Sequence, residues 1–176
     1  MEDEEMIKLI DEGLPEYITQ ETQNYQIFNE TDLLACIYNF IKKAIQSDDC
    51  WPDWSVRCNT TLGSKIPDIL VCYERKPIVV MEIKCDLHPQ TANIPYQKLT
   101  EDYKKLRYYF NQNSSLLRGY LAAVFDTDRD RKYTAKPDDT NDDIKEIFVN
   151  VREFGDYLDW KKIWSNQLKL IPDESQ

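Results

Sequence analysis

The chain has 176 residues, 41% of them hydrophobic, with four Trp, eleven Tyr and six Phe. This length and composition predict one domain with a hydrophobic core and exclude a disordered polymer. No apolar run approaches the about 18 residues that a membrane-spanning helix needs, so no membrane partner is expected.

The net charge of −10 is unevenly distributed along the chain. Residues 1–53 carry 3 basic and 13 acidic side chains, residues 57–110 carry 9 and 6, and residues 111–176 carry 10 and 13. Only the middle segment is therefore positive, at +3. Since affinity for nucleic acid comes mainly from phosphate neutralisation, this distribution excludes a tight DNA-packaging role and favours transient binding by the middle segment.

The five cysteines are odd in number and form no C-x-x-C pair. This pattern favours free thiols in a reducing compartment over a disulfide framework or a structural zinc site. The acidic N-terminus does not resemble a secretory signal or a transit peptide. We therefore expect a cytoplasmic (intracellular) protein.

Residues 1–28 are predicted to form an acidic N-terminal arm. Within it, Glu4–Glu12 favours a short helix that ends at Gly13, because Pro15 follows. A single domain is expected over residues 29–171, followed by a tail over residues 172–176.

The first core helix is predicted over residues 29–46. Asn29 is a good N-cap, Asp32 is suited to a capping-box variant, and apolar side chains recur at helical spacing from Leu33 to Ile45. Glu30 shares a face with Leu34 and Ile37.

Three strands follow in the predicted order. The first covers residues 54–61, and a β-hairpin then pairs residues 67–72 with residues 78–84 around a polar turn at 74–77. Alternation predicts that Glu82 and Lys84 share a face with Ile78 and Val80, whereas Ile83 points the other way. Charged side chains in an otherwise apolar strand require a specific role.

The rest of the chain predicts a helix over residues 96–113, a buried strand over 120–125, a last strand over 144–151 and a closing helix over 156–170. The acidic stretch 126–143 lacks the glycine and glutamate of a calcium loop, so we expect a surface loop there. The single histidine, His88, lies in a polar loop and is expected at the surface.

The hairpin resembles the signature of the PD-(D/E)xK nuclease superfamily. Pro67-Asp68 begins its first strand, and Glu82-x-Lys84 follows fourteen residues after Asp68 in its second. The resemblance covers roughly residues 29–125 and implies an α/β, restriction-endonuclease-like fold: an α-β-β-β-α-β core with a mixed central sheet flanked by helices.

The resemblance also implies the roles of particular residues. Asp68, Glu82 and the backbone carbonyl of Ile83 would bind Mg²⁺ or Mn²⁺, and Lys84 would orient the attacking water or stabilise charge on the phosphate. Glu30 would be an auxiliary catalytic acid, although it is also suited to stabilise the helix N-terminus. Both interpretations of Glu30 remain open.

The helix over 96–113 would line the substrate cleft and contact nucleic acid through Lys98, Lys104 and Lys105. Asp102-x-x-Lys105 also resembles a subgroup with Asp and Lys on this helix. The alternative for these charges is a solvated helix face.

The implied activity is metal-dependent hydrolysis of phosphodiester bonds in DNA, or alternatively in RNA. A second hypothesis keeps the fold without the chemistry: a nucleic-acid-binding or protein-interaction module. Its acidic surface would suit a protein partner or a second copy in a homodimer.

Overall fold

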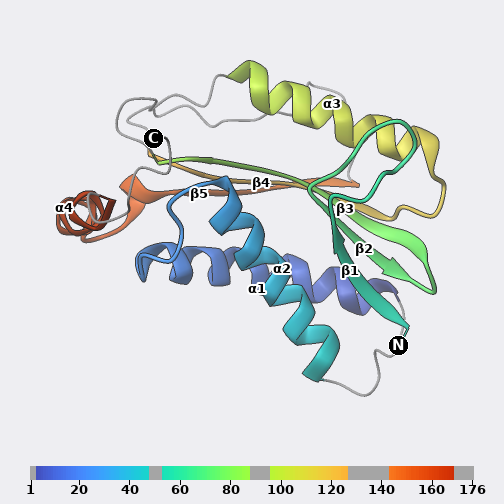
Figure 1. The fold of residues 1–176 in the computed structure, drawn as a ribbon, viewed down its shortest axis with the longest axis horizontal. Helices are drawn as coiled ribbons and strands as arrows, with labels where there is room; N and C mark the ends of the chain where they lie inside the picture. Colours follow the sequence, from blue (N-terminus) through green and yellow to red (C-terminus); the bar gives the residue numbers. More distant parts are fainter. Residues whose placement is uncertain (1–2, 48–52, 88–95, 127–142, 169–176) are drawn as a thin grey trace, which may run out of the picture.

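A five-stranded mixed sheet lies at the centre of the protein, with helices on both of its faces (Figure 1). A computed structural model describes residues 3–47, 53–87, 96–126 and 143–168. In chain order the elements are α1 (Asp3–Gln23), α2 (Glu30–Ser47), β1 (Trp54–Cys58), β2 (Ile69–Tyr73), β3 (Lys76–Asp86), α3 (Tyr96–Gln112), β4 (Arg118–Phe125), β5 (Ile144–Asn150), the 3₁₀ turn η1 (Val151–Glu153) and α4 (Tyr157–Leu168). This confirms the prediction of a mixed α/β fold.

The strands lie in the sheet in the order of the sequence. β1, β2 and β3 are antiparallel neighbours, whereas β4 is parallel to β3 and β5 is parallel to β4. Parallel neighbours need a crossover connection, and α3 provides it between β3 and β4. The sheet is therefore an antiparallel meander joined to a parallel half.

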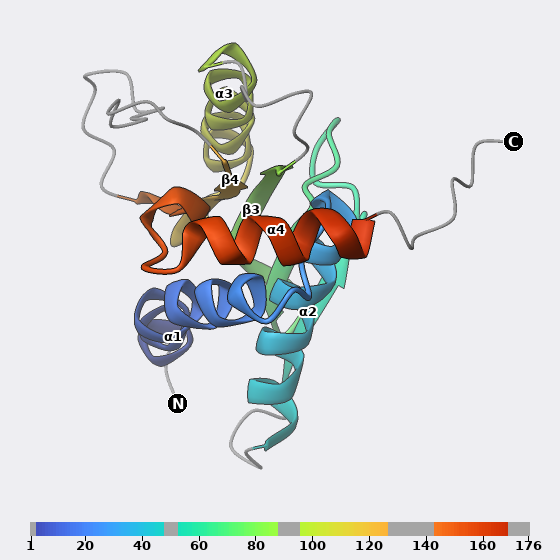
Figure 2. The ribbon, with the colours of Figure 1, turned by 90° about the vertical axis from the view of Figure 1, so that its left-hand side faces the viewer.

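Each face of the sheet has its own hydrophobic core. Helices α1 and α2 cover one face and share a core with side chains such as Met81, Ile83 and Val124 (Figure 2). Helix α4 lies at the end of the sheet and adds Trp160 and Trp164 to this core (Figure 1). Helix α3 covers the other face and packs on Val80, Leu121 and their neighbours. Side chains that alternate along β3 and β4 thus reach two different layers, as the pleat of a strand requires.

The N-terminal helix is much longer than the sequence predicts. The expected end at Gly13 is wrong, because α1 continues through Gly13 and Pro15 to Gln23. A Cβ at residue 13 would lie 2.9 Å from the ring of Phe40, so glycine here lets α1 approach α2 closely. Gly13 is therefore a packing residue and not a helix terminator.

Burial stabilises α1 despite these two helix-breaking residues. Its inner stripe has a spacing of four and is fully buried or nearly so: Met6, Ile10, Leu14, Ile18 and Thr22. The first four belong to the same core cluster as α2 and the sheet. The core of the domain thus includes residues of the segment that the sequence assigns to an acidic arm, and no core boundary exists at residue 28.

Helix α2 begins as the sequence predicts. The amide of Asp32 donates to the side chain of Asn29 at 3.0 Å, and the Asp32 carboxylate accepts from the amide of Phe28 at 2.9 Å. These reciprocal bonds satisfy amides at the helix start that have no partner within the helix. The cap therefore fixes the start of α2, which places Glu30 in its first turn.

The β2–β3 hairpin is tighter than expected and contains a bulge. Tyr73 pairs with Lys76 across a two-residue loop, so Lys76 and Pro77 belong to β3 and not to the turn. The register then moves by one residue, which leaves Ile78 as the extra residue of β3. Ile78 consequently joins the α1–α2 core, and its predicted place on the face of Glu82 and Lys84 is wrong.

The C-terminal elements lie close to their predicted bounds. Trp160 and Trp164 are buried, whereas Ile163 between them is exposed. Of the five cysteines, the four that lie in the described segments are free. No helix of the described segments is long and apolar enough to cross a membrane. His88 and most of the acidic stretch 126–143 lie outside the described residues.

Candidate active site

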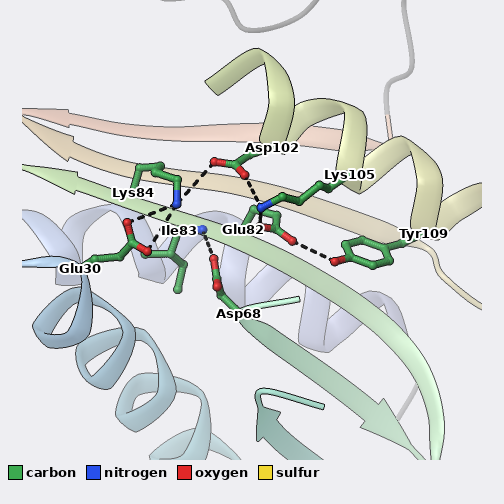
Figure 3. A network of polar contacts seen from close by, with 8 residues as sticks. All are labelled: Glu30, Asp68, Glu82, Ile83, Lys84, Asp102, Lys105 and Tyr109. Carbon is green, nitrogen blue, oxygen red and sulfur yellow. Dashed lines mark hydrogen bonds and ion pairs between the residues drawn. The ribbon is translucent and has the colours of Figure 1, made fainter. Parts of the chain in front are cut away.

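Glu82 is a buried carboxylate in the middle of β3, with only 1% of its surface exposed. It points toward α3, where the amine of Lys105 lies 3.0 Å from Oε2 and the hydroxyl of Tyr109 donates to Oε1 at 3.1 Å (Figure 3). A carboxylate in this position is costly unless it is paired or hydrogen-bonded. Both of its oxygens therefore have a donor from α3.

Asp102 is a second buried carboxylate, one turn before Lys105 on α3. Its Oδ1 lies 2.6 Å from the Lys105 amine, and its Oδ2 lies 3.6 Å from the amine of Lys84. Oδ2 is fully buried and has no hydrogen-bond donor. Asp102 thus connects the lysine of β3 with the lysine of α3.

Lys84 lies between two helices. Its amine is 3.2 and 3.3 Å from the carboxylate oxygens of Glu30 on α2, in addition to its ion pair with Asp102. Burial would lower the pKa of Lys84, but Asp102 and Glu30 more than offset this effect and the pKa is raised. The Lys84 side chain is therefore held as a cation between α2 and α3.

Asp68 lies directly before β2, at the end of the hairpin. Ile69 pairs with Met81, so the next antiparallel pair along is Asp68 with Glu82. Its Oδ2 accepts from the amide of Ile83 at 2.7 Å. Burial raises the pKa of Asp68, and the bond from Ile83 and the charge of Lys84 only partly oppose the shift. The two carboxylates of the predicted motif thus share one end of the hairpin.

The loop before Asp68 is attached to α3. Leu62 and Lys65 pair through their backbones around Gly63, whose φ of +66° favours glycine. The hydroxyl of Tyr108 lies 3.1 Å from the amide of Ser64 and 2.8 Å from its Oγ. Tyr108 is next to Tyr109, so α3 contacts both the Asp68 loop and Glu82.

The site carries more negative than positive charge. Four carboxylates (Glu30, Asp68, Glu82 and Asp102) accompany two amines (Lys84 and Lys105), which gives a net charge of −2 when all are ionised. Burial, followed by repulsion from Asp68, raises the pKa of Glu82 to about 7. Asp68 and Glu82 repel each other when both are ionised, so a cation bound near both carboxylates would stabilise their charged forms.

The donor set fits a hard divalent cation that keeps most of its water. Across the described residues, no three His, Cys, Asp or Glu side chains are arranged to hold a metal ion by themselves. Mg²⁺ does not need such a cage, since it is commonly bound by one or two carboxylates and retains several waters. The pair of Asp68 and Glu82, in a cluster whose net charge is −2, meets this requirement.

The lysines predicted to bind nucleic acid have different environments. Lys98 and Lys104 are exposed on α3. Lys105, in contrast, points into the site and is bound by Glu82 and Asp102, so its amine is not on the outer surface with the other two. The bonds from the two carboxylates outweigh burial and raise the pKa of Lys105.

Sequence reasoning did not include Tyr109 in the site and named Asp102 only through a weak pattern. Asp102, Lys105 and Tyr109 follow one another at intervals of three and four residues, which puts them on one helix face. Asp102 and Tyr109 each lie three residues after a member of the buried stripe, Leu99 and Leu106, which could have predicted that they point inward.

A third buried carboxylate, Asp126, lies directly after β4. It accepts from Arg152 at 2.6 Å, from Lys161 at 2.7 Å and from the hydroxyl of Tyr157 at 2.9 Å. Burial would raise the pKa of Asp126, but these donors lower it. The first aspartate of the acidic stretch 126–143 therefore anchors η1 and α4 to the sheet.

Comparison with protein-family models, with curated proteins and with solved structures found no match to this chain.

Proposed function

We propose that this protein is a metal-dependent nuclease of the PD-(D/E)xK type, which hydrolyses phosphodiester bonds in DNA or, alternatively, in RNA. The observation that carries the proposal is the pairing of Asp68 and Glu82 at one end of the hairpin, beside Lys84, in a cluster with a net charge of −2. Like charges close together in a partly buried site are unfavourable unless a cation binds there. Such arrangements are common in active sites.

The order of elements supports the same proposal. Helix α2, the antiparallel strands β1–β3, the crossover helix α3 and the parallel strand β4 follow the α-β-β-β-α-β order of the restriction-endonuclease-like fold. In this arrangement α2 and α3 lie on opposite faces of the sheet. Side chains from both helices nevertheless reach Lys84, because it lies near the end of β3.

Each residue of the site would have a distinct role. Asp68, Glu82 and the carbonyl of Ile83 would hold Mg²⁺ or Mn²⁺, which when bound supplies an activated water and stabilises charge on the phosphate. Lys84 would orient the water or the phosphate. Glu30 accepts from the Lys84 amine and would therefore position it, which is a more specific role than stabilising the helix terminus.

Cleavage assays test this proposal directly. Purified protein is incubated with single- and double-stranded DNA and with RNA, in the presence of Mg²⁺ or Mn²⁺, beside a Lys84→Ala variant. We expect Lys84→Ala to lose on the order of a hundredfold or more in rate, as loss of one preorganised charge typically does. Lys162→Ala, which removes an exposed lysine of α4, is the matched control and should cleave like the wild type.

A thermal-shift measurement separates metal binding from catalysis. A divalent cation should raise the melting temperature of the wild type and of Lys84→Ala, but not that of Asp68→Asn or Glu82→Gln. If the wild type neither cleaves nor responds to the cation, the proposal is wrong and a non-catalytic binding module becomes the better interpretation. Equal cleavage by wild type and Lys84→Ala would instead indicate a contaminating nuclease.

A further inference from the structure

The Lys105 amine lies between two buried carboxylates, 3.0 Å from Glu82 and 2.6 Å from Asp102 (Figure 3). Glu82 and Asp102 are 1% and 2% exposed, whereas the side chain of Lys105 is 37% exposed. Each carboxylate would be costly to bury without a cation next to it. Lys105 therefore serves as the counter-ion of both.

Lys105 is ion-paired with Glu82, which is a proposed metal ligand. It contacts Oε2 of Glu82, while the Tyr109 hydroxyl uses Oε1. A divalent cation approaching Glu82 would meet a positive charge already bound to the same carboxylate. Like charges at this separation repel, and in a partly buried site water screens the repulsion only in part.

The two lysines of the site differ in this respect. Lys84 contacts Glu30 and Asp102. Lys105 contacts Glu82 directly, although its sequence position suggested a contact with the phosphate backbone. The geometry thus gives Lys105 a function that is distinct from both substrate binding and the role of Lys84.

We propose that the Lys105 ammonium is an internal cation, which neutralises Glu82 in the metal-free protein and competes with the divalent cation for that carboxylate. This inference rests on the proposed metal-dependent function. It predicts that the protein keeps Glu82 paired without metal, and that metal affinity is lower than the two carboxylates alone would give. Asp102 provides a second contact that can retain the ammonium when a metal binds.

The test is a titration of the metal-free protein with Mn²⁺ by isothermal calorimetry. Lys105→Gln removes the charge but keeps a hydrogen-bond donor, so it should bind Mn²⁺ about tenfold more tightly or better, a difference of about 1.4 kcal/mol. Lys105→Arg keeps the charge and should bind within about threefold of the wild type. Lys104→Gln removes an exposed charge one residue away and should bind like the wild type.

Circular dichroism of each variant checks that it is folded, and if Lys105→Gln does not fold, Lys105→Met replaces it in the same comparison. Equal or weaker Mn²⁺ binding by the neutral variant overturns the inference, even where the wild type binds metal and cleaves. Tighter binding by Lys104→Gln to the same degree would also overturn it, because net charge would then explain the effect. If neither the wild type nor the neutral variants bind Mn²⁺, the inference and the metal-dependent function are both wrong.

Discussion

Replacing Glu82 by Gln should change the pH dependence of folding stability. Burial and the neighbouring Asp68 raise the pKa of Glu82 from 4.5 to about 7, despite the opposing contact with Lys105. The folded protein thus binds this proton more tightly than the unfolded chain does. Stability from this group is fully present below about pH 4.5 and is lost as the pH rises through 7.

The size of the effect follows from the same values. The difference between 4.5 and about 7 corresponds to about 3 kcal/mol, at about 1.4 kcal/mol for each tenfold change in proton affinity. A stability change of this size is large for a domain whose total stability is typically about 5–15 kcal/mol. Gln cannot ionise, so the variant should escape this loss.

Chemical denaturation of chelator-treated protein at several pH values between 5 and 8 provides the measurement. Relative to the wild type, Glu82→Gln should gain about 2.5 kcal/mol of unfolding free energy between pH 5 and pH 8, because part of the loss has already occurred at pH 5. Glu101→Gln, which removes an exposed carboxyl on the same helix as Lys105, should show no such gain. A difference between Glu82→Gln and wild type that does not depend on pH would refute the reasoning, because Glu82 would then ionise equally well in both states.

Two further predictions concern α1 and the outer face of α3. Deleting residues 1–14 should unfold the domain, since burial of Met6, Ile10 and Leu14 together contributes about 5–9 kcal/mol to its stability. Circular dichroism checks this. The control is the double variant Glu4→Gln, Glu5→Gln, which changes two exposed side chains and should remain folded. A folded deletion variant would show that α1 is dispensable. Replacing the exposed Lys98 and Lys104 by Ala should weaken DNA binding for all sequences and reduce its salt slope by about one unit per lost phosphate contact. An unchanged slope in a fluorescence-anisotropy titration would mean that these lysines form only a solvated face.

Local sequence patterns were sufficient for most elements of the fold. The cap at Asn29 and the apolar runs of β2 and β4 depend on neighbours within a few residues, so the sequence carries them directly. The hairpin spacing likewise predicted that Asp68 and Glu82 would lie at the same end of the hairpin. The observed register of β2 and β3 agrees with this prediction. The placement of these two carboxylates was thus predictable, because it depends on strand pairing.

Tertiary contacts decided the remaining features, and they overrode local preferences. Gly13 and Pro15 would end an isolated helix, but close packing on Phe40 and a buried stripe extend α1 to Gln23. The bulge at Ile78 depends on pairing between strands and changes which face that residue occupies.

The partners of Glu82 also depend on the tertiary structure. Lys105 and Tyr109 lie 23 and 27 residues beyond it in the chain, and only the packing of α3 on the sheet brings them to its two oxygens. The sequence alone determined that a carboxylate pair would lie at the end of the hairpin. The tertiary structure decided that Lys105 neutralises Glu82. A buried carboxylate has little contact with water, so its hydrogen-bond donors must come from the layer that packs on it.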